Sequence, residues 1–154
     1  MSSVENYIPY SANAEGFTQV LIDLKSTMPS QTVFKVTGYE TTCFEDVVQG
    51  QVLYSRASDG QVGKAIANDT FDKACVAGVA ETTKTAGQSI KVIVAGIVAT
   101  SGLNTGDQYF LSAASAGAIV ETPPSTAGQY VTRVGEAGST GQFIVNADRP
   151  ILLS

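Results

Sequence analysis

The chain has 154 residues and a mass of 16.0 kDa, which is typical of one domain or of one domain with an arm. Charged residues make up only 15% of it, the net charge is -5, and histidine and tryptophan are absent. Without an imidazole, histidine-dependent catalytic triads and metal sites are excluded, and the acidic balance argues against binding to nucleic acid or to an anionic membrane.

Residues 1–31 differ from the rest and are predicted to form an N-terminal arm. The arm begins with MSSVENYIPYSANAEGF, which has neither a basic stretch nor an apolar run, so no signal peptide is expected. Phe17, Val20, Leu21 and Leu24 recur at helical spacing, which predicts a helix of about two turns that ends before Pro29. Apolar residues also alternate here, so a strand is the alternative.

From residue 32 onward the pattern predicts an all-β domain, 32–154, built as a compact β-sandwich or barrel. Short runs rich in Val and Ile are interrupted about every ten residues by Gly, Asn, Asp or Pro, which is typical of such folds. Asp59-Gly60 lies between two runs and predicts a tight hairpin. The predicted strands are 32–37, 47–56, 61–67, 74–81, 89–99, 108–112, 118–121, 129–136 and 142–146.

The β domain contains a candidate internal repeat, with units at 47–100 and 101–150. GQVLYSRASDGQVGKA, from Gly50, resembles GDQYFLSAASAGAIVET, from Gly106, and Gly78 and Gly135 follow at matching distances. Gly-Gln pairs at 87–88 and 141–142 then open a further strand in each unit. A chain rich in Gly, Ser and Ala also produces such matches by chance. If the repeat is real, the halves are expected to pair into one core without exposed sheet edges.

Carboxylates are the only candidates for acid–base catalysis. Glu40, Glu45 and Asp46 precede a predicted strand, where acids usually cap turns. The segment 68–72 is predicted to be a turn, because it lacks the glycine and the final glutamate of a calcium loop. Cys43 and Cys75 are predicted to be buried, reduced thiols, with a disulfide as the alternative. We therefore expect no catalytic residue, no cofactor and no metal site, and a protein that is not an enzyme.

The candidate binding residues lie in the arm. Aromatic side chains beside a proline, in a segment too polar and short for a core of its own, are typical of anchors for a partner surface. The predicted partner-binding residues are Tyr7, Ile8, Pro9, Tyr10 and Phe17.

The second half of the chain resembles a β module that is widespread in virion proteins of tailed phages. Its members read Gly-Asp-x-aromatic-aromatic-Leu-Ser, then Gly and a short strand, Thr-x-Pro-Pro, a Val-Gly-x-Ala turn and a final strand. The resemblance covers about residues 47–150 and is absent from the first 46. The matching residues are Gly106, Asp107, Tyr109, Phe110, Leu111, Ser112, Gly117, Pro123, Pro124, Val134, Gly135 and Ala137.

The resemblance implies a structural protein of the virion. Such modules occur in capsid decoration (cement) proteins, in fibres and in other appendages, and the small size favours decoration because a fibre needs a shaft. We therefore expect a protein that binds the outer shell between subunits of the major capsid protein and stabilises the head. The resemblance also implies a homotrimer on the capsid surface, assembled in the host cytoplasm. The alternative is a short tail or head fibre, or a receptor-binding module for glycans.

Overall fold

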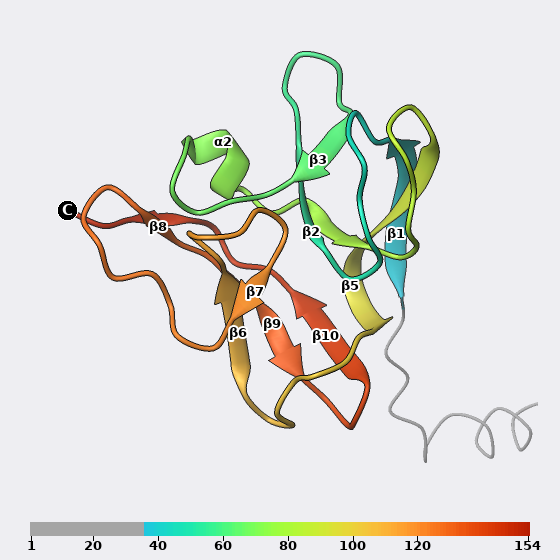
Figure 1. Cartoon of the computed structure of the whole chain (residues 1–154). Helices are drawn as coiled ribbons and strands as arrows, with labels where there is room; N and C mark the ends of the chain where they lie inside the picture. Colours follow the sequence, from blue (N-terminus) through green and yellow to red (C-terminus); the bar gives the residue numbers. More distant parts are fainter. Residues whose placement is uncertain (1–35) are drawn as a thin grey trace, which may run out of the picture. The chain divides into compact units, whose positions relative to one another are not determined.

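The computed structural model describes residues 36–154 and confirms the predicted all-β fold. The predicted arm and its helix lie outside the described residues. Within 36–154 the chain forms eleven strands and one four-residue helix, and the large antiparallel sheet curls into a half-barrel (Figure 1). The elements are β1 (Thr37–Thr42), β2 (Val52–Ser55), β3 (Val62–Lys64), α2 (Phe71–Ala74), β4 (Gly78–Ala80), β5 (Ser89–Ala99), β6 (Gln108–Leu111), β7 (Ile119–Val120), β8 (Tyr130–Val131), β9 (Arg133–Ala137), β10 (Gln142–Asn146) and β11 (Ile151–Leu152).

The strand predictions are most accurate for the longest and most regular apolar runs. The segments 89–99 and 142–146 coincide with β5 and β10. Of the strand predicted at 32–37 only residues 36 and 37 are described, and β1 begins at the second of them and continues to Thr42. Gly38 lies inside β1, at a point where β5 approaches closely. An added Cβ would lie 2.6 Å from the carbonyl oxygen of Val92.

The predicted strand 129–136 is present as two strands, β8 and β9, because the chain divides at Thr132. The side chain of Thr132 is fully buried, and its hydroxyl donates to the carbonyl oxygen of Ala74 at 3.0 Å. On one side of this anchor β8 pairs with β11, which was not predicted, and on the other β9 pairs with β6 and β10. One apolar run therefore supplies strands to two different sheets.

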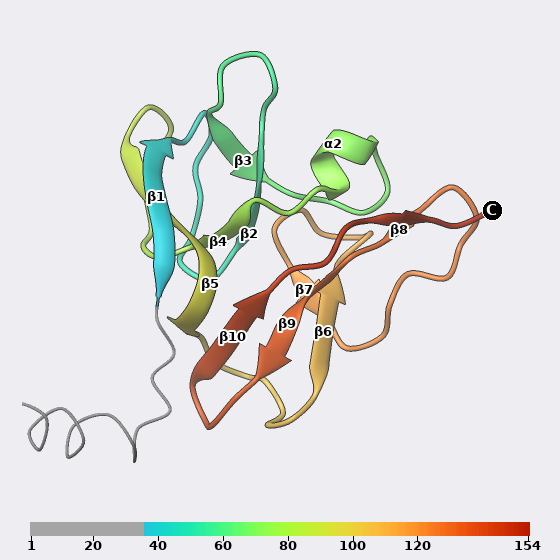
Figure 2. The same ribbon diagram turned by 180° about the vertical axis from the view of Figure 1, so that it is seen from behind.

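The large sheet has the same strand order in each of its halves. Its order is β3-β2-β4-β5-β10-β9-β6-β7, with β1 beside β5, and every pair is antiparallel. The first half contributes β2, β3, β4 and β5 to this order, and the second half contributes β6, β7, β9 and β10. If the strands of each half are numbered in chain order, both halves have the order fourth, third, first, second outward from the central β5–β10 pair. Figure 2 shows β10, β9 and β6 side by side. Two copies of one unit would produce this order, while the unit boundaries stay a prediction.

Equivalent hydrogen bonds precede the first strand of each half. Gly50 N–H donates to the carbonyl oxygen of Ala80, and Gly106 N–H donates to that of Ala137, both at 2.9 Å. Both glycines have a positive φ, of 87° and 89°, which glycine adopts without the steric cost of a Cβ. The glycines that start the two matched sequences thus begin strands in the same way.

Gly78 and Gly135 also occupy matching places. Gly78 lies in β4 against β5, and Gly135 lies in β9 against β10. An added Cβ would strike the carbonyl oxygen of Ile93 at Gly78 and that of Ile144 at Gly135. Both positions need glycine because the neighbouring backbone occupies the space of a side chain.

Three turns between strands have the sequence Ser/Thr-x-Gly-Gln, at 85–88, 126–129 and 139–142. In each, the glutamine N–H donates to the carbonyl oxygen of the first residue at 3.0–3.1 Å, and the glycine has a φ of 80–89°. This is the geometry of a type II turn, which requires a positive φ at its third residue. The two Gly-Gln pairs noted in the sequence open β5 and β10, as predicted.

The core consists of two clusters because several strands are buried on both faces. In β2, for example, Val52 and Tyr54 face the larger cluster and Leu53 faces the smaller one. Next to the smaller cluster, Phe44 N–H, just after β1, donates to the carbonyl oxygen of Val62 at 3.0 Å. The larger cluster combines both halves and contains Val52, Tyr54, Ala65, Ala67, Ala74, Val79, Ile93, Val98, Tyr109, Leu111, Val134, Ala137, Phe143 and Val145.

Candidate interaction surfaces

The predicted partner-binding residues Tyr7, Ile8, Pro9, Tyr10 and Phe17 lie outside the described residues. Asp, Glu and Cys side chains of residues 36–154 do not gather in groups of three that could hold a metal ion. No helix in the same part of the chain has the length and hydropathy needed to cross a membrane. The candidate sites within residues 36–154 are therefore surfaces of the β domain.

Of the three acids before β2, Asp46 caps a turn as predicted, whereas Glu45 and Glu40 contact residues of the strands β3 and β5. Glu45 Oε2 accepts from Lys64 N–H at 2.7 Å, and Asp46 Oδ1 accepts from Ala86 N–H at 2.8 Å. Glu40 Oε1 accepts the hydroxyl proton of Ser89 at 3.4 Å. The three carboxylates contact three different segments and do not converge on one cleft.

The two cysteines are free thiols, as predicted. Cys43 is fully buried, and its thiol donates to the carbonyl oxygen of Thr85 at 3.1 Å. Cys75 is only half-buried, which differs from the prediction of full burial. Desolvation by burial raises the pKa of the Cys75 thiol above its ordinary value, and the nearby Asp72 raises it further.

The segment 68–72 combines a turn with the start of α2. Thr70 caps the helix, because its hydroxyl oxygen accepts from Lys73 N–H at 3.3 Å. Lys73 Nζ lies 2.7 Å from Asp69 Oδ2, so these two neighbouring charges form an ion pair. The prediction of a plain turn is therefore wrong for Phe71 and Asp72, which belong to the helix.

The helix α2 and the β8–β11 ribbon beside it carry a set of apolar side chains, the ribbon patch: Phe71, Tyr130 and Leu152, which adjoin one another, and Ile151, which points to the opposite face of β11. Ile151 and Leu152 in β11 are 65% and 59% exposed, the highest values among large apolar side chains of residues 36–154. Phe71 is exposed, and its ring meets that of Tyr130 edge-on at a centroid distance of 6.0 Å. Figure 1 shows the β8–β11 ribbon at the side of the large sheet, next to the C-terminus.

A hollow of about 430 Å³ adjoins the ribbon patch. Arg133 Nε lies 3.3 Å from Asp148 Oδ2 at its rim. Arg149 and Asp72 have no ion-pair partner within residues 36–154, and both act electrostatically on Cys75. The hollow thus joins apolar side chains to one charge of each sign. Its lining residues are Phe71, Cys75, Val76, Ala147, Asp148, Arg149 and Pro150.

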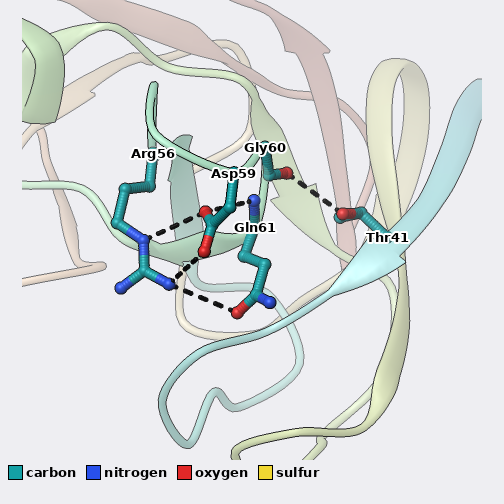
Figure 3. A network of polar contacts seen from close by, with 5 residues as sticks. All are labelled: Thr41, Arg56, Asp59, Gly60 and Gln61. Atoms are coloured by element: carbon teal, nitrogen blue, oxygen red, sulfur yellow. Dashed lines mark hydrogen bonds and ion pairs between the residues drawn. The ribbon is translucent and has the colours of Figure 1, made fainter.

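The tip of the β2–β3 hairpin carries a polar network (Figure 3). Arg56 makes two hydrogen bonds to the carboxylate of Asp59, at 3.1 and 2.6 Å, and one to Gln61 Oε1 at 3.3 Å. Thr41 in β1 donates its hydroxyl proton to the carbonyl oxygen of Gly60 at 3.1 Å. The predicted hairpin is present, with a positive φ of 75° at Gly60.

Below this tip an aromatic hollow of about 300 Å³ lies between charged side chains. The Arg56 guanidinium stacks over the ring of Phe44 at 4.1 Å, and that ring meets Tyr54 edge-on at 6.0 Å. Lys64 Nζ lies 3.9 Å from Glu45 Oε1 at its edge. Its lining residues are Phe44, Glu45, Tyr54, Lys64, Ile66, Asp69, Lys73 and Ala116.

Sequence reasoning missed both hollows and the ribbon patch. The available signal for the ribbon patch was Ile151-Leu152-Leu153, an apolar triplet after Pro150 that no predicted strand included. The aromatic hollow combines residues from separate strands, which only the fold brings together. Comparison with known proteins adds no assignment, because no protein-family model and no curated protein matches the chain.

Proposed function

We propose that the protein is a phage capsid decoration protein that binds the outer shell between major capsid subunits and stabilises the assembled head. The resemblance of the second half to virion β modules supports this proposal. The matched stretch forms β6, β7, β9 and β10, which make up one half of the large sheet, and β8, which pairs with β11 in the small sheet. The observation that carries most weight is the ribbon patch, because Phe71, Tyr130 and Leu152 adjoin one another, and adjoining exposed apolar side chains are typical of protein-binding surfaces.

The physical basis of the proposed function is selective binding to the assembled shell. A protein that binds only the assembled state stabilises it by mass action, by about 2.7 kcal/mol per site at a hundredfold excess over the Kd. Many identical sites on one shell add these contributions. A body whose inner strands are buried on both faces suits this task, because it transmits load without repacking.

The arm is proposed to be the anchor, and deletion of residues 1–16 tests this. The truncated protein is expected to lose binding to purified expanded shells and to keep its β-sheet circular dichroism, because the deleted residues lie outside the β domain. Binding is measured by co-sedimentation with the shells. The matched control is Ser11→Ala, which leaves the aromatic–proline cluster intact and is expected to bind. Full occupancy of the shells by the truncated protein would show that the arm is not the anchor.

The location in the virion is tested by electron microscopy of particles with and without the protein. Regular density on the shell surface that disappears with the protein is expected. Density confined to the tail would instead support the fibre alternative. The copy number per surface site also tests the homotrimer that the resemblance implies.

The glycan-binding alternative draws support from the aromatic hollow. Aromatic rings beside carboxylate and ammonium groups are suited to polar ligands with an apolar face, such as sugar rings. A glycan array with the purified protein tests it, with Lys73→Ala as the variant that removes one polar group. Glycan binding that is weakened by Lys73→Ala would support this alternative. An array without signal would exclude the glycans on it as ligands of the protein.

A further inference from the structure

The aromatic hollow contains a buried hydroxyl group that the protein does not use. Tyr54 lines the hollow and is only 7% exposed, and its hydroxyl has no hydrogen-bond partner among residues 36–154. Tyr109 is buried to a similar degree, but its hydroxyl accepts from Asn104 N–H at 2.9 Å and donates to Glu121 Oε2 at 3.0 Å. Buried polar groups almost always have a partner. The Tyr54 hydroxyl is therefore available to a molecule in the hollow.

Lys64 and Glu45 add a donor and an acceptor to the same hollow. Lys64 Nζ lies 3.9 Å from Glu45 Oε1, which is within the range of an ion pair but too long for a hydrogen bond. The carboxylate is fixed through its other oxygen, Oε2, which accepts from Lys64 N–H at 2.7 Å. Because a ligand hydroxyl both donates and accepts, one such group can bond to the ammonium and to Oε1.

The apolar part of the hollow is built around the ring of Phe44. The Arg56 guanidinium stacks over this ring at 4.1 Å. Gly63 in β3 leaves the space that the ring occupies, because an added Cβ would strike it. Two aliphatic side chains, Ile66 and Ala116, complete the apolar lining. The aromatic surface is thus held in place before any ligand arrives.

The charges of the lining favour a ligand without net charge. Lys64 and Lys73 are matched by Glu45 and Asp69, so the hollow has two charges of each sign. Lys73 Nζ is already occupied, at 2.7 Å from Asp69 Oδ2. An anionic ligand would lie beside two carboxylates, and a cationic ligand would lie beside two ammonium groups. Either would meet repulsion that a neutral ligand avoids.

We propose that the aromatic hollow binds one ring of a neutral sugar. A pyranose has C–H groups on its faces and hydroxyls around its edge, which match an apolar wall bordered by a few polar groups. One face of the sugar packs beside Phe44 and Ile66. Its hydroxyls bond to Tyr54 Oη and to the Lys64–Glu45 pair. The volume of about 300 Å³ is at the small end of ligand pockets, which suits one ring rather than several.

The first test is a titration of the full chain with galactose, glucose and mannose as separate probes, followed by amide NMR. At least one sugar is expected to shift the amide signals of Glu45, Lys64 and Ala116, with a Kd of about 1 mM. The uronic acid of the same sugar carries an added carboxylate and is expected to bind at least about tenfold more weakly.

The second test uses two pairs of matched variants. Tyr54→Phe removes the unpartnered hydroxyl and is expected to weaken sugar binding at least about tenfold. Tyr39→Phe makes the same change at an exposed tyrosine outside the hollow and is expected to bind normally. Ala116→Trp fills the hollow and is expected to abolish binding. Ala114→Trp, in the same exposed loop but outside the lining, is expected to bind normally.

Stability separates a ligand-binding hydroxyl from a structural one. Tyr54→Phe is expected to unfold at the urea concentration of the wild type or above it, because the hydroxyl has no bond within the domain to lose. Tyr109→Phe is expected to unfold at a lower concentration, because it removes two hydrogen bonds. Equal destabilisation by the two changes would show that the Tyr54 hydroxyl has a structural partner and would overturn the proposal.

Three further results would overturn it. They are hollow amides that none of the three sugars shifts at about 100 mM, binding that Tyr54→Phe and Ala116→Trp leave unchanged, and a uronic acid that binds as tightly as its neutral sugar. The sugar site does not depend on the proposed capsid function, because its residues belong neither to the arm nor to the ribbon patch. Tyr54→Phe is therefore expected to co-sediment with shells as the wild type does. Shell binding without sugar binding would refute the sugar site alone, and the reverse would refute the capsid function alone.

Discussion

At the scale of single residues, the fold depends on a few positions where only glycine fits. Gly78 and Gly135 lie directly against the backbone of the next strand, so neither neighbour can move aside as a flexible side chain would. Their equivalence is also the strongest evidence from single residues that the two halves are similar, because the same steric constraint recurs at the same place in the strand order.

Gly135→Ala is expected to destabilise the protein by about 2–4 kcal/mol, because β9 and β10 must separate to admit the methyl group. The matched control is Gly138→Ala, where an added Cβ lies 3.4 Å from the Cδ1 atom of Ile144, an ordinary contact. That change is expected to stay within about 0.5 kcal/mol. Urea unfolding measures both, and equal midpoints would contradict the close-approach argument.

Asp59 provides a prediction about pH. Hydrogen bonding from the Arg56 guanidinium, and then from Gln61 N–H, lowers the pKa of Asp59 below its ordinary value. Because the folded-state pKa is the lower one, the carboxylate stabilises the fold above about pH 3.9. This contribution is lost as the pH falls through the folded-state pKa.

In Arg56→Gln the pKa of Asp59 is expected to rise toward its ordinary value, which a carboxyl-carbon NMR titration measures. Lys73→Gln is the control, since Lys73 pairs with Asp69 and should leave Asp59 unchanged. An identical pKa in the wild type and Arg56→Gln would show that the guanidinium does not set it.

At the scale of elements, turns that contain a Gly-Gln pair set where strands begin. Gln51 closes the turn before β2, because its Oε1 accepts from Val48 N–H at 2.9 Å. Gln88 does the same for Thr85 N–H at 2.8 Å before β5. The side chain thus satisfies a backbone donor at the start of each turn, which explains why glutamine follows the glycine.

Gln51→Ala is expected to cost about 1 kcal/mol, because Val48 N–H loses its partner. Gln49→Ala, in the same turn, removes a side chain for which residues 36–154 provide no hydrogen bond, and it is expected to change stability by less than about 0.5 kcal/mol. Thermal unfolding of the two variants side by side checks the difference. A larger loss in Gln49→Ala would contradict the capping role.

Elements also show what the sequence predicts well and what it does not. The strands β5 and β10 follow from long, uninterrupted apolar runs, and the hairpin at Asp59-Gly60 follows from turn chemistry. The division at Thr132, the glycine inside β1 and the strand β11 depend on contacts between distant segments, which no local pattern encodes. The candidate surfaces follow the same rule: the apolar triplet after Pro150 was visible, but its place at a free sheet edge was not.

At the scale of the whole molecule, the larger core cluster makes the two halves interdependent. Val52, Tyr54 and Val79 come from the first half, while Leu111 and Phe143 come from the second. Neither half can bury its own share of this cluster, even though each has the complete strand order of a unit.

Fragments 47–100 and 101–150 are therefore expected to remain unfolded when expressed separately. Chains of about 50 residues bury a smaller fraction of their surface than larger domains do and are at best marginally stable. The full chain is expected to unfold in one transition, observed at the same urea concentration by circular dichroism and by tyrosine fluorescence. A dispersed NMR spectrum from either fragment would contradict this interdependence.

Because the two cysteines are unequally buried, their thiol-labelling rates report on the opening of two different regions. Cys43 belongs to the smaller cluster, whereas Cys75 lines the hollow beside the ribbon patch. A thiol reagent reaches Cys43 only when the smaller cluster opens, but it reaches Cys75 through movements of the ribbon region alone. The ratio of the two labelling rates therefore reports how much more often the proposed contact surface opens than the core does, without any introduced probe.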